Sequence, residues 1–275
     1  MSDNVHINVI VDNTTSHAGF VAEHGLSLWI EYQGKKILFD TGQSNAVISN
    51  AKKLGIDLAK TDAIVLSHGH YDHTGGLPYV LEVATKAKIY LHPSAVEPKF
   101  SKKKSSVKHI GMPESAKKIL EKRNVIWTEK PTDLFFDVEV TGQVPRINDF
   151  EDVGGHFFLD ENYQNPDCLI DEQSLFIEST RGMIVVLGCA HAGVVNILDY
   201  ISQLTGYKQI YAVIGGMHLL NADKTRIENT IDAFNKFDVQ KLVLLHCTGQ
   251  DVMENFKSVF GDRCIVSGAG DKIIL

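Results

Sequence analysis

Four side chains that can bind a metal ion stand within six positions of this chain: His68, His70, Asp72 and His73, in the stretch SHGHYDH that begins at Ser67. A β-branched apolar run precedes them and predicts a buried strand. Side chains at i and i+2 of an extended chain share a face, so His68 and His70 are expected to hold one ion. Where the chain then turns, Asp72 and His73 can face a second ion. Imidazole and carboxylate suit Zn²⁺, Fe²⁺ or Mn²⁺ better than Ca²⁺, which prefers oxygen ligands.

Three glycines, Gly69, Gly75 and Gly76, stand within this stretch or just after it. Glycine adopts backbone conformations that bulkier residues resist, so tight turns are expected here. Three histidines and one aspartate at this spacing are more typical of a ligand set than of a structural loop.

The order His-x-His-x-Asp-His after a buried strand resembles the signature of the metallo-β-lactamase superfamily. Asp40, in Leu38-Phe-Asp-Thr-Gly42, is similar to the first motif of that superfamily, a buried aspartate behind the metal loop. The resemblance implies that Asp40 fixes the orientation of a ligand. From the residues alone, an aspartate before Thr-Gly could equally form a turn. The expected cofactor is zinc, as one or two ions, with iron or manganese as alternatives.

Four further stretches extend the resemblance over nearly the whole chain and look like the subfamily related to dihydropterin-forming synthases of methanopterin-type biosynthesis. They are Ala22-Glu-His-Gly-Leu-Ser27, Gly188-Cys-Ala-His-Ala-Gly-Val-Val-Asn196, Gly215-Gly-Met-His-Leu219 and Leu245-His-Cys-Thr-Gly249.

The resemblance implies additional metal ligands in the second half of the chain. Cys189 takes the place of the bridging aspartate of the superfamily, and it is either a ligand or a buried neutral thiol. His191 is the candidate for the third histidine, with Asp171 as the runner-up and His156 as a weaker alternative. His246, at the end of a predicted strand, matches the last ligand of the superfamily.

Other residues are candidates for catalysis and substrate binding. His218 follows a glycine pair and is expected to be a general acid or to bind substrate, with direct ligation as the alternative. Asp72 is also expected to be a catalytic residue, because it would act through the metal that it binds. Glu23 and His24 are expected to line the same site, although His24 could instead be a core histidine.

Metal-dependent hydrolysis is the function that these residues favour, with His218 protonating the leaving group. The subfamily resemblance implies a transferase as an alternative, which would join a dihydropterin methyl diphosphate to an aminobenzene ribose phosphate. A second alternative is an iron-dependent redox enzyme. Redox members of the superfamily favour a glutamate within the first motif and a flavin domain, whereas Gly69 and Tyr71 stand here and no flavin domain follows. A binding module with an inactive site is disfavoured because all four ligands of the first motif are intact.

A basic segment, 99–123, interrupts a chain whose formal net charge is −7. It includes Lys99, Lys102, Lys103, Lys104 and Lys108. We expect it to cover the site and to attract a small anionic metabolite, a phosphate or diphosphate, with Lys103 as a substrate-binding residue. The alternative is a solvated surface loop.

Alternating strands and helices must position these residues. Apolar patterns predict strands at 7–11, 26–32, 36–40, 63–66, 88–91, 175–178, 183–187, 210–214 and 241–245, and helices at 45–54, 77–87, 194–204 and 227–237. Neighbouring strands joined by hairpins indicate mixed sheets. We therefore expect an αββα sandwich, an α+β fold with two mixed sheets face to face and helices on their outer faces. It should form one domain over 1–275, with an irregular basic insertion at about 93–167.

The composition of the 275 residues, 44% hydrophobic and 22% charged, is that of a globular protein. Its negative charge disfavours nucleic acid as a partner. Four scattered cysteines favour reduced thiols and a cytoplasmic location. The first residues lack a targeting pattern, and no stretch reaches the roughly 18–20 apolar residues of a membrane span. The oligomeric state is left open.

Overall fold

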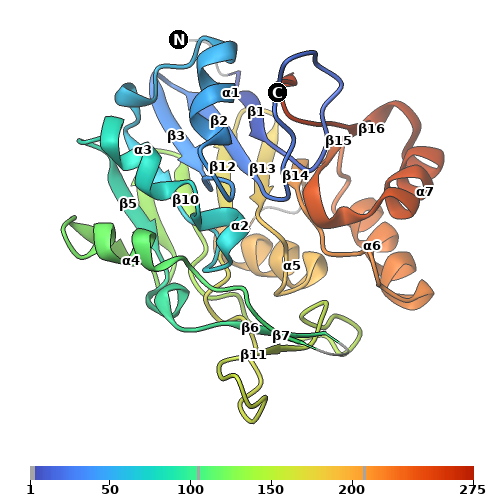
Figure 1. Cartoon of the computed structure of the whole chain (residues 1–275). Helices are drawn as coiled ribbons and strands as arrows, with labels where there is room; N and C mark the ends of the chain where they lie inside the picture. Colours follow the sequence, from blue (N-terminus) through green and yellow to red (C-terminus); the bar gives the residue numbers. More distant parts are fainter. Residues whose placement is uncertain (1–3, 104–105, 207–208) are drawn as a thin grey trace.

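Two seven-stranded sheets face each other in the computed structural model, which describes residues 4–103, 106–206 and 209–275 (Figure 1). In the first sheet, β17, β1, β2 and β3 are antiparallel neighbours, and β3, β4, β5 and β8 are parallel. The tight turn between β2 and β3 lies at Gln33-Gly34, where both residues have positive φ. The strands, in spatial order, are β17 (Lys272–Ile274), β1 (His6–Val11), β2 (Ser27–Tyr32), β3 (Lys35–Phe39), β4 (Ala63–Val65), β5 (Lys88–Leu91) and β8 (Val125–Trp127).

The second sheet is also mixed. Its first four strands are parallel neighbours, and the remaining strands are antiparallel. The strands, in spatial order, are β16 (Cys264–Val266), β15 (Lys241–Leu244), β14 (Ile210–Gly215), β13 (Gly182–Leu187), β12 (Leu175–Ser179), β10 (Val138–Val140) and β9 (Thr132–Phe135).

Helices cover the outer face of each sheet (Figure 1). The first sheet packs against α1 (Ala46–Leu54), α3 (Leu77–Val83) and α4 (Glu114–Leu120), and the second against α5 (Val194–Thr205), α6 (Lys224–Lys236) and α7 (Gln250–Phe260). The short helices are α2 (Tyr71–Thr74), η1 (Leu58–Lys60), η2 (Pro93–Val96), η3 (His246–Thr248) and η4 (Gly261–Arg263). No helix in the described residues is both long enough and apolar enough to cross a bilayer.

Successive side chains along a strand point to opposite faces of the sheet, and in the second sheet both faces are buried. Along β13, Ile184 and Val186 pack between the sheets, whereas Val185 and Leu187 pack against the outer helices. Each large apolar side chain buried in this way, such as Phe234 on α6, contributes roughly 1.5–3 kcal/mol to folding. This packing holds the strand ends, and therefore the site, in place.

The predicted αββα architecture with two mixed sheets is confirmed. The expectation of an irregular segment at 93–167 differs from the structure, because β8 belongs to the first sheet and β9 and β10 belong to the second. A small separate sheet in this segment consists of β11 (Phe157–Phe158), β6 (Phe100–Lys103) and β7 (Ser106–His109). The sequence patterns also missed α7, β16 and β17. Because β17 returns to pair with β1, the two halves of the chain do not map one to one onto the sheets.

Candidate metal centre

The candidate site lies where parallel strands of both sheets end. In the first sheet, Asp40 follows β3 and His68 follows β4. In the second sheet, Cys189, His218 and His246 follow β13, β14 and β15. The carboxyl ends of parallel strands meet at one edge of a sheet, which is where open α/β sheets bind ligands. Here the two sheets present such edges to the same site.

One group of possible ligands, which we call the first set, consists of His68, His70 and His191. All three are buried, and their candidate ligand atoms lie within 4.8 Å of one another. His68 Nε2 and His70 Nδ1 are 2.9 Å apart. The expectation that His191 joins the first two histidines therefore agrees with where the structure places it.

Hydrogen bonds on the far side of two rings orient the first set. His191 Nδ1 donates to the Val153 carbonyl at 2.7 Å, which leaves Nε2 facing the other histidines. His68 Nδ1 contacts Ser67 Oγ at 2.9 Å, and the Ser67 hydroxyl donates to Asp40 Oδ2 at 2.7 Å. Partners of this kind fix both the tautomer and the ring orientation of histidines that bind metals.

A second set is formed by Asp72, His73 and His246. His73 Nε2 lies 3.2 Å from His246 Nε2, and Asp72 Oδ2 lies 3.7 Å and 3.5 Å from these two atoms. The ring of His24 joins them from the solvent side, with Nε2 at 3.1 Å from Asp72 Oδ2 and a side chain that is 55% exposed. His24, which we predicted as a substrate-binding residue, is thus also placed as a possible fourth ligand.

The second set is oriented in the same way as the first. His73 Nδ1 donates to Asp40 Oδ2 at 2.7 Å, so Asp40 occupies the supporting position that the sequence predicted for it. His246 Nδ1 donates to Asn13 Oδ1 at 2.9 Å, and the His246 backbone N–H donates to Asp12 Oδ1 at 2.7 Å. The sequence analysis missed Asp12 and Asn13, because they lie more than 230 positions from His246 and belong to no local motif.

The electrostatics of the site suit a cation. Burial lowers the pKa values of His68, His70 and His191 well below the ordinary histidine value, which keeps these rings neutral and able to donate a lone pair. Burial alone would raise the pKa of Asp72, but His73 and its hydrogen-bonded histidine neighbours hold it well below the usual range. The first set therefore offers neutral imidazoles. In the second set, burial lowers the pKa of His73, but the carboxylates of Asp40 and Asp72 raise it to about 9, so a cation there would have to displace the His73 proton.

Two buried imidazole nitrogens bear on whether these residues can bind a metal. His70 Nε2 and His191 Nε2 meet no hydrogen-bond partner among the described residues. A buried polar atom without a partner costs free energy, and a bound ion removes that cost where the atom is a ligand. His191 Nε2 faces the first set, so the donors present fit a transition metal.

Two cysteines stand beside both sets. Cys189 Sγ lies 3.2 Å from His73 Nε2, and its atom groups with those of His68 and His73 within 4.8 Å. The residue that replaces the bridging aspartate therefore lies between the two sets. A further group is formed by Cys189, His218 and Cys247. The sequence analysis gave Cys247 no role, although its position directly after His246 was an available signal.

The glycines of the metal loop are required for a different reason from the one that the sequence suggested. None of Gly69, Gly75 and Gly76 has positive φ. A Cβ at Gly69 would instead lie 2.1 Å from the Ala95 carbonyl oxygen, and one at Gly76 would lie 2.0 Å from that of Thr41. Neighbouring backbone approaches the loop too closely for any side chain.

Some predicted site residues lie elsewhere. The carboxylate of Glu23 accepts hydrogen bonds from Gln43 N and Ser44 N at 3.1 Å and 3.2 Å, so it holds the loop after β3 instead of binding substrate. His156 is exposed and outside both sets. The side chain of Lys103 lies outside the described residues.

Asp171, the runner-up ligand, is also used differently. Its carboxylate accepts from Gly69 N at 2.8 Å and from Lys99 Nζ at 2.8 Å. Lys99 also contacts Asp167 Oδ2 at 2.9 Å, and its side chain is 1% exposed. Lys99 is therefore not a surface lysine of the basic segment but the centre of a buried ion cluster behind the metal loop.

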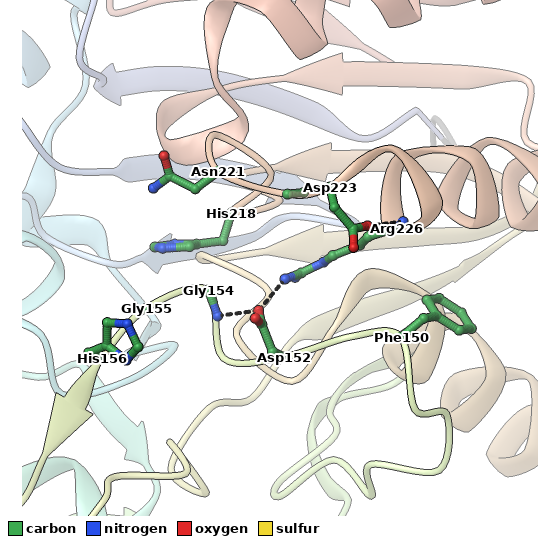
Figure 2. Close-up of a pocket in the computed structure, with 10 residues that line it drawn as sticks. Phe150, Asp152, Gly154, Gly155, His156, His218, Asn221, Asp223 and Arg226 are labelled. Atoms are coloured by element: carbon green, nitrogen blue, oxygen red, sulfur yellow. Dashed lines mark hydrogen bonds and ion pairs between the residues drawn. The ribbon is translucent and has the colours of Figure 1, made fainter.

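Three cavities meet at His218. A cavity of about 160 Å³, which we call the metal cavity, is lined by two members of each set, and Tyr71 and Lys108 lie at its wall, joined by a 3.1 Å hydrogen bond. A polar cavity of about 410 Å³ extends toward Arg226, and Figure 2 shows His218 beside Gly154 at its edge. A larger, more apolar cavity of about 680 Å³ is lined by His218, Leu220 and Met253.

Comparisons with known proteins agree with this geometry. The family model described as the metallo-beta-lactamase superfamily matches residues 21–209. The 7,8-dihydropterin-6-methyl-4-(beta-D-ribofuranosyl)-aminobenzene-5'-phosphate synthase of Methanocaldococcus jannaschii is 32% identical, over 94% of each chain. An uncharacterized protein of the same organism, MJ0448, is 33% identical over 88% of this chain and 90% of its own length. Among solved structures, Tm1679, described as a metal-dependent hydrolase of the beta-lactamase superfamily, has a TM-score of 0.84 and 31% identity over 98% of both chains. This chain, with its two sets of ligands at the ends of parallel strands, belongs to the metallo-beta-lactamase superfamily.

Proposed function

We propose that this protein is an enzyme that holds two transition-metal ions and hydrolyses a small anionic substrate carrying a phosphate or diphosphate group. The observation that carries the proposal is the pair of buried sets of possible ligands, His68/His70/His191 and Asp72/His73/His246, each oriented from behind by hydrogen bonds. Zinc is the proposed metal. Ions held there would supply Lewis acidity, which makes hydroxide available from water at neutral pH.

The residues of the chain have separate tasks in this proposal. Asp72 keeps its charge and counters that of the metal centre. His218 lies at the junction of the three cavities and donates a proton to the leaving group. Although burial lowers the pKa of His218, the neighbouring Cys247 raises it above the usual value, which favours a protonated ring near neutral pH.

The anionic character of the substrate is supported by Lys108, a lysine of the basic segment that lines the metal cavity. Its ammonium group lies 4.7 Å from the centre of the Tyr71 ring. A positive charge at the wall of a small cavity raises the local concentration of anions.

The proposal is tested first on metal content. Protein purified without added metal should contain up to two transition ions per chain by elemental analysis. The double variant His70→Ala/Asp72→Ala should lose most of this metal yet keep its circular dichroism spectrum, because the large apolar core does not depend on metal. Undiminished metal in the folded double variant would place the centre elsewhere.

The second test concerns His218. We expect His218→Ala to keep its metal and to lose roughly 10²–10⁴-fold in kcat against phosphoesters and diphosphates, the usual contribution of a general acid. His6→Ala, which removes an exposed histidine on β1, is the matched control and should behave as wild type. Loss of an ion in His218→Ala would make His218 a ligand, and unchanged turnover would remove it from the mechanism.

A second candidate function is a transferase reaction. In it, the whole dihydropterin-methyl unit leaves its diphosphate and is joined to an aminobenzene ribose phosphate. It is favoured by the 32% identity to the synthase over 94% of the chain. Two large cavities that both include His218 in their lining also leave room for two reactants. Diphosphate release that requires the arylamine would favour transfer, whereas release from the pterin diphosphate alone would favour hydrolysis.

A further inference from the structure

Arg226, on the first turn of α6, is buried with few partners. Its side chain is 4% exposed, and Nη1 lies 2.6 Å from Asp152 Oδ1. Nε and Nη2 meet no hydrogen-bond partner within the described part of the chain. Burying a guanidinium costs several kcal/mol unless its N–H groups are satisfied, so this arginine lacks part of the compensation that it requires.

The partner of Arg226, Asp152, is an exposed residue. The side chain of Asp152 is 79% exposed, and the other hydrogen bond to its Oδ1 comes from Gly154 N in the same loop, at 2.8 Å. Figure 2 shows the Asp152 carboxylate between the guanidinium and the Gly154 backbone, and all three residues line the polar cavity. The exposed carboxylate can be replaced by another anion, whereas the buried guanidinium requires a negatively charged partner in that place.

The cavity beyond this ion pair is large enough for part of a substrate. It measures about 410 Å³ and is lined by Arg226, Asn221, His156 and His218. Asp223 also lines it, but its carboxylate accepts from Arg226 N at 2.8 Å and caps α6. His218 also lines the metal cavity, so the two cavities adjoin at this ring.

We propose that this polar cavity binds a phosphate group of the substrate through Arg226, and that the Asp152 carboxylate occupies the phosphate position until the substrate displaces it. The inference rests on the proposed function only for the identity of the substrate. The planar guanidinium matches the oxygens of phosphate, and a group with several acceptor oxygens can accept from more than one of its N–H groups, whereas Asp152 supplies one oxygen to Nη1.

Binding of inorganic phosphate to the folded protein tests the proposal without turnover. Titration calorimetry is done on the metal-loaded protein and on the His70→Ala/Asp72→Ala variant, in which phosphate has no metal to bind. In the second background we expect Arg226→Met to weaken phosphate binding by on the order of 10–100-fold, the value of a charge-assisted hydrogen bond. Asp152→Asn removes the competing charge and should tighten binding severalfold.

Two further variants keep the result interpretable. Arg226→Lys retains the charge without the planar fork, and we expect a folded protein with intermediate affinity even if Arg226→Met is unstable. Lys224→Met removes an equal charge from the same helix, where the side chain is 87% exposed, and should leave phosphate binding unchanged. Acetate in place of phosphate shows whether any small carboxylate is bound equally well.

Opposite effects of Arg226→Met and Asp152→Asn on phosphate affinity distinguish a binding site from a structural ion pair. If the pair only held the loop, both Asp152→Asn and Arg226→Met would weaken binding or stability. Equal phosphate affinity in wild type and Arg226→Met, weaker affinity in Asp152→Asn, or equal affinity for acetate would overturn the proposal. Phosphate binding that follows these variants in a protein without hydrolase activity would instead reject the proposed function and retain the anion site.

Discussion

One carboxylate orients a histidine of each ligand set. Asp40 Oδ2 accepts from His73 Nδ1 at 2.7 Å and from the Ser67 hydroxyl at 2.7 Å, and Ser67 Oγ lies 2.9 Å from His68 Nδ1. Asp40 Oδ1 accepts from Ser67 N at 2.7 Å, so the carboxylate is held from both sides. The two sets are therefore coupled through a residue that lies in neither.

We expect Asp40→Asn to weaken metal binding by roughly 10–100-fold, as is typical when a residue that orients a metal ligand is changed. The amide keeps the volume but offers only one oxygen to three donors. Affinity is measured by competition with a chromogenic chelator. Asp57→Asn, which changes an exposed carboxylate on the same half of the chain, is the control. Wild-type affinity in Asp40→Asn would show that the metals do not depend on this network.

The two sets should be separable by single substitutions. His191→Ala removes a ligand of the first set and His246→Ala one of the second, so each variant is expected to lose about one ion while keeping most of the other. Elemental analysis after dialysis against a weak chelator gives the stoichiometry. Loss of both ions in both variants would indicate a single cooperative centre.

Lys99 should matter for stability more than for activity. Lys99→Met leaves Asp167 and Asp171 buried without their cation, and removing one partner of a buried ion pair costs about 3–5 kcal/mol. Urea unfolding measures the loss. Lys118→Met, at a side chain that is 68% exposed, should stay within about 0.5 kcal/mol of wild type. A similarly small change in Lys99→Met would mean that water reaches the two aspartates.

Glu172 should make stability depend on pH. Burial raises the pKa of Glu172 to about 7 from its ordinary value of 4.5, so between these values the folded state binds more protons than the unfolded state. Stability therefore falls as pH rises through this window, by roughly 3 kcal/mol in all at about 1.4 kcal/mol per pKa unit.

Glu172→Gln should remove that fall. We expect the variant to be more stable than wild type at pH 8 and about equal at pH 4.5, measured as the difference in urea unfolding between the two proteins at each pH. A constant difference across this range would contradict the raised pKa. A Glu161→Gln control, at an exposed loop position, should show no such difference.

The local motifs could be predicted because their meaning is contained in a short stretch. His68, His70, Asp72 and His73 lie where a buried strand gives way to a turn, so spacing alone separates the first pair from the second. His246 was recognised for the same reason, since it directly follows an apolar strand. The αββα fold followed from strand and helix periodicities, which depend on burial of alternating or helical faces.

Roles that depend on a distant partner could not be predicted in this way. Lysine and arginine usually lie on the surface. Lys99 is instead buried in an ion cluster, and Arg226 lies at a cavity, because acidic residues from other segments lie beside them. Glu23 was predicted to line the site, but its carboxylate accepts a hydrogen bond from the backbone of the loop after β3. The sequence by itself determined which ligand types this protein carries and on which strand ends they stand. The tertiary structure alone decided which of them meet, because hydrogen bonds and ion pairs form between atoms within about 3 Å of each other, however far apart they lie along the chain.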